Sequence, residues 1–336
     1  MSIQALFETF HKKIKVETDE LRDKRDILSA KIKSSINKNG HPTPDIINQG
    51  SYIYGVGIKP LNDQEYDIDV GFIFPIHAQN HTPTKVRAWV YDAIKQHTNS
   101  VEDRGPCIRV RYAAGFHVDL VIYAKYYNSD NENYQLARNN DTWVPSQPKE
   151  LKSHIVDARQ RFIETRDSTG ADQIQRITRY LKRWNDLDIP DDSPNKPSGL
   201  ATLLLVINSL PAPVMDNNGK SNDLESLILI AQQVTHSLGR IVVKKPTIPY
   251  EDLYEKLDDK AMHHLKKRFS SLLSDLEACR KISLTDAVSL LAIQFGSDFP
   301  TNFNNSQPEA NNTSDLIEDM KKAIPTFKNP AKPWSN

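Results

Sequence analysis

Residues 50–70 read GSYIYGVGIKPLNDQEYDIDV, and this stretch carries the clearest indication of fold and chemistry in the chain. It opens on Gly50 and Ser51, and sixteen residues after Ser51 it reaches Asp67 and Asp69 at the start of an apolar run. A glycine lets phosphate oxygens approach the main chain, and a serine can donate both its hydroxyl and its backbone N–H. Alone, the Gly-Ser pair is better explained as an ordinary helix N-cap. The spacing to the aspartates makes a phosphate turn the more specific interpretation.

Side chains alternate along a strand, so Asp67 and Asp69 are expected on one face, roughly 7 Å apart. Asp119 lies in a second apolar run of the same character. If the two strands are neighbours, about 4.8 Å apart, the carboxylates can converge. Converging carboxylates repel one another and need cations to hold them together. Two Mg²⁺ ions about 4 Å apart would neutralise them and suit in-line displacement at phosphorus, and Mn²⁺ could substitute.

The alternative is that an Asp-x-Asp pair is ordinary in a chain with 43 acidic residues. Acidic residues in loops are usually solvated surface. Asp67 and Asp69 differ in their placement, because an acidic group that enters a strand loses hydration and needs a partner.

Composition bounds the class of protein. The chain has 336 residues, 38% of them hydrophobic, which allows one large domain or two. Lys+Arg and Asp+Glu number 43 each, so no basic excess favours long nucleic acid. Cys107 and Cys279 offer neither zinc-ligand spacing nor a disulfide framework. No run approaches the ~20 apolar residues of a membrane helix, and the N-terminus lacks the pattern of a signal peptide. We expect a soluble cytoplasmic protein.

The periodicity predicts an α/β (α+β) chain. A long helix, either straight or kinked, is expected over 3–38, a helix over 84–97 and a polar loop with at most a short strand over 128–150. Strands are expected over 68–74, 107–112 and 117–124, the last two forming a hairpin. Helices are expected over 155–163, 171–184, 200–210, 224–238, 254–282 and 286–295, and a mobile polar surface over 298–314. Arg109 and Arg111 either point toward the cleft from the strand before Asp119 or lie on its outer face, and we favour the outer face.

The motifs resemble those of polymerase β-type nucleotidyltransferases and, more narrowly, the CD-NTases. These are bacterial cGAS/DncV-like nucleotidyltransferases that make cyclic oligonucleotide signals in anti-phage (CBASS) defence. The matching pieces are the GSxxxGxxIKP pattern at 50–60, DIDV at 67–70, HVDLV at 117–121, TWVPSQPK at 142–149 and YLKRW at 180–184. Family members commonly carry Thr where this chain has Val56.

The resemblance implies a nucleotidyltransferase catalytic core with a mixed sheet over residues 1–160, including the N-terminal helix. A C-terminal helical domain over 161–336 would close the NTP cleft. Asp67, Asp69 and Asp119 would be catalytic and bind two Mg²⁺ per site. Ser51, with Gly50, would hold the triphosphate from one side, and Lys182 and Ser198 from the other. Ser198 is equally plausible as a helix N-cap, and Arg176 and Arg183 as a solvated basic face.

The implied reaction joins NTPs, ATP or GTP among them, into a cyclic di- or trinucleotide with release of pyrophosphate. The alternatives are transfer to a linear RNA or small-molecule acceptor, or a catalytically inactive nucleotide-binding regulator. We expect a monomer that binds neither a membrane nor long double-stranded DNA. CBASS regulatory or effector proteins are candidate partners. Base identity, linkage, ring size and activating signal depend on features that the sequence does not place.

Overall fold

The chain opens with two helices where a single long one is predicted over 3–38. In the computed structural model these are α1 (Ile3–Ile14) and α2 (Asp19–Lys38). The break falls at Lys15, which is extended and forms an antiparallel bridge with Ile58. The backbone there pairs with the segment after the Gly-Ser turn in place of continuing the helix. The structure describes residues 2–17, 19–61, 66–128, 131–190 and 193–301.

The described residues form a seven-stranded mixed sheet, with β1, β2, β5, β4 and β3 in that order and β6 and β7 continuing from β5. β2 and β5 are parallel, and the other neighbouring pairs are antiparallel. The mixed α/β class is therefore confirmed, as is the hairpin of β4 and β5. The strands are β1 (Asp45–Gln49), β2 (Tyr66–Phe74), β3 (Val101–Asp103), β4 (Ile108–Tyr112), β5 (Phe116–Asn128), β6 (Asn131–Ala137) and β7 (Trp143–Ser146).

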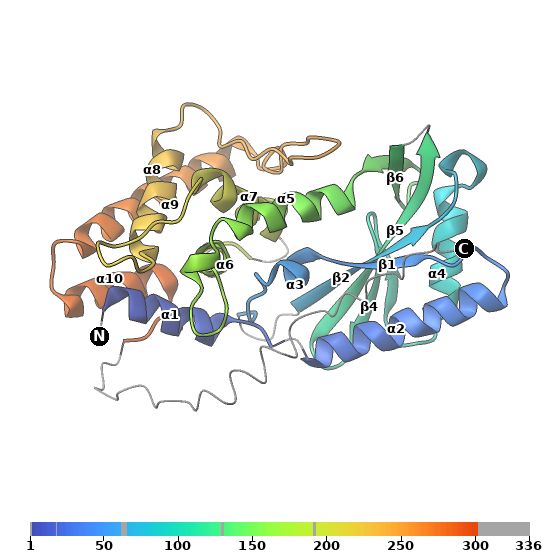
Figure 1. The fold of residues 1–336 in the computed structure, drawn as a ribbon, viewed down its shortest axis with the longest axis horizontal. Coiled ribbons are helices and arrows are strands. Elements are labelled where there is room, and N and C mark those ends of the chain that lie inside the picture. The colour runs from blue at the N-terminus through green and yellow to red at the C-terminus, as the bar shows by residue number, and fades with distance from the viewer. Residues whose placement is uncertain (1, 18, 62–65, 129–130, 191–192, 302–336) are drawn as a thin grey trace, which may run out of the picture. The chain divides into compact units, whose positions relative to one another are not determined.

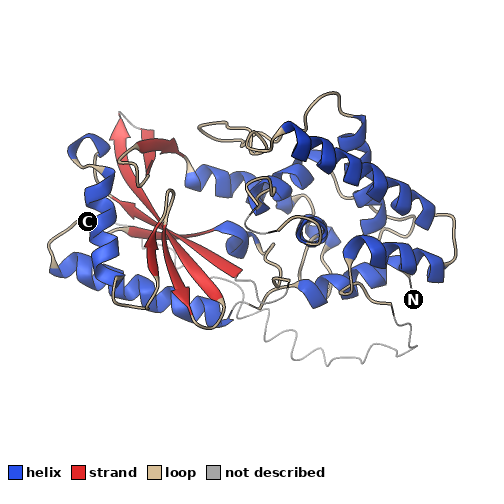
Figure 2. Ribbon diagram, turned by 180° about the vertical axis from the view of Figure 1, so that it is seen from behind, coloured by secondary structure: helices blue, strands red, loops and turns tan. Residues whose placement is uncertain are grey.

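One face of the sheet is covered by α2 and α4 (Pro83–Ile94) (Figure 2). Apolar side chains of both helices pack on alternate residues of the central strands, such as Ile68, Val70 and Val118. Because strand side chains alternate, the residues between these apolar positions must project from the opposite face. The two aspartates of β2 and the aspartate of β5 belong to that second set.

Strands β6 and β7 occupy the segment predicted as a polar loop over 128–150. β6 extends the sheet beside the last residues of β5, and β7 pairs with β6. The prediction was wrong because the strand pattern here is mostly polar and half-exposed. Such strands form through pairing with an existing sheet edge more than through an apolar period of their own.

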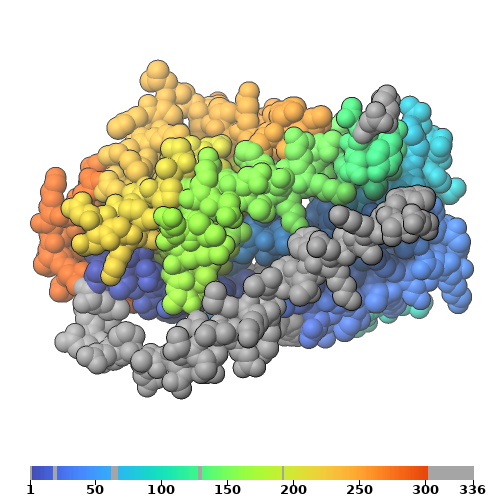
Figure 3. Space-filling model, in the orientation of Figure 1, coloured from blue at the N-terminus to red at the C-terminus, as the bar shows by residue number. Residues whose placement is uncertain are grey.

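Helices and the loops between them make up the rest of the described chain, and α1 packs among these helices, not on the sheet (Figure 1). Phe7 and Phe10 of α1 lie 5.1 and 5.5 Å, ring centroid to ring centroid, from Tyr180. In the space-filling view, the green surface of α5 and α6 lies between the blue surface of α2 and the yellow-to-orange surface of α8 and α9 (Figure 3). The helices are α5 (Pro148–Gln160), α6 (Gln173–Asp186), α7 (Gly199–Ser209), α8 (Asp223–His236), α9 (Asp259–Cys279) and α10 (Leu284–Phe295).

Phe299 joins the same aromatic cluster and is 1% exposed, so the mobile-surface interpretation is wrong at this residue. The rest of that predicted segment, from residue 302 on, lies outside the described residues. Residues 2–301 form one compact unit, and the division into domains at residue 160 stays a prediction.

Both cysteines are free and buried, in agreement with the absence of a disulfide framework in the sequence. Within the described ranges, none of the helices combines the length and apolar character needed to cross a membrane.

His11 of α1 forms a buried polar contact with α6. Its Nδ1 lies 2.8 Å from an Nη1 of Arg179, and its Nε2 lies 3.2 Å from the Thr169 hydroxyl. Burial, with the nearby Arg179, lowers the pKa of His11 to about 3. Since arginine can only donate, Nδ1 must be the acceptor, so folded His11 is neutral.

We expect acid to destabilise the protein through His11. The unfolded chain binds a proton below about pH 6.5 and the folded chain does not, so stability is lost as pH falls from about 6.5 toward 3. His11→Gln keeps a neutral donor and acceptor without titrating. The loss of unfolding free energy between pH 7 and pH 5 should therefore be smaller in the variant by up to about 2 kcal/mol. Urea denaturation at the two pH values measures it, and equal losses in both proteins would contradict a neutral buried His11.

Candidate active site

The register of four strands places the predicted carboxylates in adjacent rows on one sheet face. Asp69 of β2 stands opposite Asp119 of β5, with Gln49 of β1 on one side and Arg109 of β4 on the other. Asp67 belongs to the next row. Residues in register on neighbouring strands share a face, so the strand pairing itself brings the carboxylates together.

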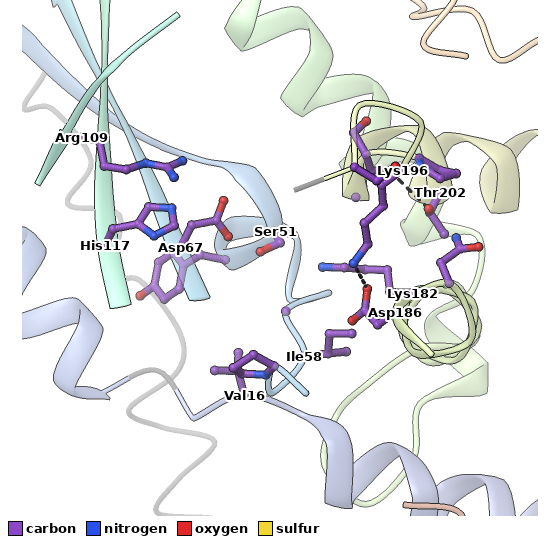
Figure 4. Close-up of a pocket in the computed structure, with 18 of the residues that line it drawn as sticks. Val16, Ser51, Ile58, Asp67, Arg109, His117, Lys182, Asp186, Lys196 and Thr202 are labelled. Carbon is purple, nitrogen blue, oxygen red and sulfur yellow. Dashed lines mark hydrogen bonds and ion pairs between the residues drawn. The ribbon is translucent and has the colours of Figure 1, made fainter. Parts of the chain in front are cut away.

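A ligand-forming cluster lies in these rows. One oxygen each from Asp67 and Asp119 and a ring nitrogen of His117, which stands opposite Asp67, all lie within 4.8 Å of one another. Figure 4 shows Asp67 and His117 side by side on their strands. Mg²⁺ takes oxygen ligands at 2.0–2.1 Å, so ligand atoms on one ion lie no more than about 4 Å apart. Small side-chain rotations would bring this cluster to such spacing.

Asp69 lies deeper, against the Gly-Ser turn. Burial raises its pKa well above the usual range for a carboxyl group, and the negative charges of Asp67 and Asp119 raise it further. Arg109 and Lys182 act in the opposite direction. The three carboxylates repel one another, and Arg109 and Lys182 offset that repulsion only in part. Together the carboxylates form a set of oxygen ligands that fits a divalent cation.

Gly50 is required by this packing. Its φ of +67° lies in the left-handed region, and a Cβ added there would sit 1.8 Å from an Oδ of Asp69. The turn therefore places Ser51, at the start of the short helix α3 (Gly50–Tyr54), directly beside the carboxylates. The Gly-Ser turn and the aspartate pair are parts of a single packed arrangement.

Gly50→Ala should reduce activity at least about 100-fold, because the added methyl group must displace either Asp69 or the turn. Gly40→Ala is the matched control, since Gly40 has almost the same φ, +68°, and nothing within 4 Å of an added Cβ. Both variants should lose similar stability from backbone strain, and only Gly50→Ala should lose activity. Initial rates and thermal denaturation measure the two effects, and an active Gly50→Ala enzyme would contradict the assigned packing.

Arg109 of β4 stands opposite Asp119 at the end of the row formed by Gln49, Asp69 and Asp119. Its guanidinium donates to both carboxylate oxygens of Asp119, at 2.8 and 2.7 Å. Arg109 and Arg111 both line the cleft, so their interpretation as outer-face residues is wrong. The register explains the error, because the residue opposite Asp119 on an antiparallel neighbour must share its face. A cation bound by Asp119 would share that carboxylate with Arg109.

The facing wall of the cleft comes from α6 and the start of α7. Lys182 of α6 donates to the Val56 carbonyl oxygen at 3.2 Å. Burial lowers its pKa, while the charge of Asp67 works in the opposite direction. Ser198 caps α7 by accepting from the Ala201 N–H at 3.2 Å, as the alternative interpretation held, and it also lines the cleft.

The remaining arginines of α6 do not face the cleft. Arg176 is fully buried in a bidentate ion pair with Asp223, and Arg183 is buried and donates to the Lys59 carbonyl oxygen at 2.7 Å. The alternative interpretation of Arg176 and Arg183 as a solvated basic face is therefore wrong, because both side chains are buried. Of the basic residues predicted on this helix, Lys182 is the one that lines the cleft.

The two walls enclose adjoining cavities, and Figure 4 draws residues that line one of them. One, of about 730 Å³, extends past Arg109, His117 and Lys196. Another, of about 450 Å³, extends past Tyr123 and Leu203. Each falls in the range of small-molecule sites. Both cavities are lined by Ser51, Asp67, Lys182, Ser198 and Gly199. The predicted phosphate-binding residues thus form a boundary shared by the cavities, while Lys196 was missed because a loop lysine carries no periodic signal.

A mixed sheet that carries an Asp-x-Asp pair and a third aspartate, with a Gly-Ser turn and a helical wall, defines the nucleotidyltransferase class. Residues 44–123 match the model of the nucleotidyltransferase domain of cyclic GMP-AMP synthase DncV-like proteins. Residues 44–123 therefore carry a nucleotidyltransferase domain of the DncV-like type, which confirms the resemblance seen in the sequence.

Relatives agree with this assignment. A c-di-GMP synthase of Roseivirga ehrenbergii is 21% identical over 255 residues, which cover 69% of this chain and 65% of that protein, just under two thirds of its length. Vibrio cholerae DncV cyclic AMP-GMP synthase superposes with a TM-score of 0.68 at 17% identity, covering 86% of this chain and 93% of that one. The CD-NTase CdnG of Bradyrhizobium diazoefficiens, solved with GTP, gives 0.69 at 16% identity, covering 87% and 94%.

Proposed function

We propose that the protein is an Mg²⁺-dependent cyclic oligonucleotide synthase that joins NTPs into a cyclic di- or trinucleotide. The observation that carries this proposal is the boundary between the adjoining cavities. It is lined by Ser51, Asp67, Lys182 and Ser198, so one nucleotide on each side would meet at the carboxylates. A site for a single nucleotide transferred to water would not need a second cavity on the other side of the same residues.

In the proposed reaction, a ribose hydroxyl oxygen of one nucleotide attacks the α-phosphorus of the other. A new P–O bond forms, the bond to the β-phosphate oxygen breaks, and pyrophosphate leaves with the electron pair. Asp67, Asp69 and Asp119 would hold two divalent ions, which neutralise the triphosphate and acidify the attacking hydroxyl. Asp119, fixed by Arg109, would orient that hydroxyl.

The triphosphate would be held between the two walls. Ser51, with Gly50, would donate to it from the sheet side, and Lys182 and Ser198 from the helical side. Lys182 is half-buried and partly desolvated, so its charge is screened less than that of an exposed lysine. Repeating the step on the linear product, with the roles of its two ends exchanged, would close the ring and release a further pyrophosphate.

Product analysis tests this proposal. The purified protein is incubated with all four NTPs, ATP and GTP among them, and Mg²⁺ or Mn²⁺, then treated with phosphatase. Phosphatase-resistant nucleotide that is absent with the double variant Asp67→Asn/Asp69→Asn supports cyclisation. Phosphatase-sensitive ladders would instead support transfer to a linear acceptor, and no turnover under any condition would support an inactive nucleotide-binding regulator.

We further propose that the product is a signal in CBASS anti-phage defence in the cytoplasm, made by a monomer. The family assignment supports this role, and the balanced charge of the chain gives no support to activation by long double-stranded DNA. Regulatory or effector proteins of such a system would be its partners. Phage plating on cells that carry the native gene with its neighbours, against the same cells with Asp67→Asn, tests the role; equal plating would contradict it.

A further inference from the structure

One face of α6 is fastened to the backbone that follows the Gly-Ser turn. Its donors recur at spacings of four, three and one residues, and the first two spacings place Gln175, Arg179 and Lys182 on one helix face. Each donates to a main-chain carbonyl oxygen of the segment 54–59. The pairs are Gln175 to Tyr54 and Gly55, Arg179 to Gly55, Lys182 to Val56, and Arg183 to Lys59.

Arg179 is an unusual member of this row. It is 3% exposed, and burial lowers its pKa to about 10. The hydrogen bonds described for its guanidinium go to the Gly55 carbonyl oxygen and to neutral His11. Arg176, one turn earlier on the same helix, is equally buried but is held by the carboxylate of Asp223. Placing a buried cation on a carbonyl oxygen is costly, so a compensating role is expected.

Gln175 holds the same glycine with its amide group. Its Nε2 donates to the carbonyl oxygens of Tyr54 at 3.0 Å and Gly55 at 3.3 Å, while its Oε1 accepts from the Asp172 N–H in the capping box of α6. A Cβ added at Gly55 would lie 2.3 Å from that Nε2. The first turn of α6 is therefore fixed directly against the end of α3.

The held segment is continuous with the phosphate turn. The Val56 N–H donates to the Ser51 carbonyl oxygen at 2.9 Å, so the position of Ser51 follows that of residues 55 and 56. Arg179 and Gln175 themselves line neither the 730 Å³ nor the 450 Å³ cavity. They can therefore influence a nucleotide in either of these cavities through the backbone that they hold.

We propose that Arg179 and Gln175 are positioning residues for the NTP: by holding the Gly55 carbonyl oxygen they fix α3 and place the Ser51 donors at the triphosphate. The inference rests on the proposed nucleotide binding. It assigns to α6 two functions, a direct one through Lys182 and an indirect one through the fastened turn.

Two conservative variants test this inference. Arg179→Lys keeps the charge but cannot reach both His11 and Gly55 with the same geometry. Gln175→Glu keeps the oxygen that accepts in the capping box and replaces the donor with a second acceptor. Both should raise the Kd for non-hydrolysable ATP and GTP analogues, with Mg²⁺ present, by about tenfold or more. Both should also speed amide hydrogen exchange at Val56.

Arg176→Lys is the control, since it loses a buried bidentate pair on the same helix without touching the turn. It should lower the melting temperature and leave the analogue Kd and the exchange at Val56 within about twofold of wild type. A purely structural role for Arg179 would make the three variants alike, with lowered melting temperatures and unchanged Kd. If Arg179→Lys does not fold, Gln175→Glu decides.

The outcomes separate the inference from the function on which it rests. If wild type binds the analogues and both variants bind them equally well, the positioning role is overturned and the proposed function stands. If wild type binds neither analogue, both are overturned.

Discussion

Asp69→Asn should lower the rate of pyrophosphate release at least about 1000-fold, while the metal-free protein becomes at least as stable as wild type. Both effects have one origin. The Asp69 carboxylate is half-buried against Gly50 and stands beside Asp67 and Asp119; desolvation and these two negative charges raise its pKa well above the usual range. Asparagine has the same shape without the charge, so it removes the repulsion and, with it, a ligand that a divalent ion needs. Thermal denaturation in EDTA and a coupled pyrophosphate assay measure the two quantities.

Asp45→Asn is the control for this substitution. Asp45 lies on the neighbouring strand β1, is 72% exposed and makes a long ion pair with Lys125. Its replacement should change neither the rate nor the melting temperature measurably. Asp69→Asn with more than a tenth of wild-type activity would show that Asp69 does not hold the catalytic ion.

Lys182→Met should raise the Kd for an NTP analogue about 100-fold without destabilising the unliganded protein. Lys182 is half-buried, desolvation lowers its pKa, and its described hydrogen bond goes to the Val56 carbonyl oxygen. In the absence of nucleotide its charge is poorly compensated, so a methionine of similar length fits without loss. With a triphosphate between the walls, the same charge supplies a direct, desolvated contact.

Lys256→Met is the matched control. Lys256 lines the same 730 Å³ cavity, but it is exposed. A general loss of positive charge from the cleft would affect both variants alike, whereas a direct contact affects Lys182→Met alone. Equal Kd values for Lys182→Met and wild type, by calorimetry in Mg²⁺, would remove Lys182 from the proposed triphosphate site.

The part of the site nearest in sequence could be predicted because its geometry is local. Period-two alternation places Asp67 and Asp69 on one strand face, and glycine at position 50 suits a turn that no other residue could make beside Asp69. Asp119 required one further assumption, that its strand neighbours the first, and the parallel pairing of β2 with β5 supplies it.

What could not be predicted depends on partners far away in sequence. Helix periodicity over 3–38 continues across Lys15, and only the bridge to Ile58 interrupts it. Arg109 and Arg176 are both basic residues in amphipathic elements. Arg109 forms an ion pair with Asp119, and Arg176 forms a buried ion pair with Asp223. Neither carboxylate can be matched to its arginine from spacing alone, because tertiary contacts between elements set those pairs.

Anomalous diffraction at the manganese edge tests the central claim most directly, with crystals grown in Mn²⁺ and a non-hydrolysable NTP analogue. The proposed function predicts manganese peaks bounded by Asp67, Asp69 and Asp119, with the triphosphate between Ser51 and Lys182. Manganese bound elsewhere, or a triphosphate that contacts neither Ser51 nor Lys182, would contradict it.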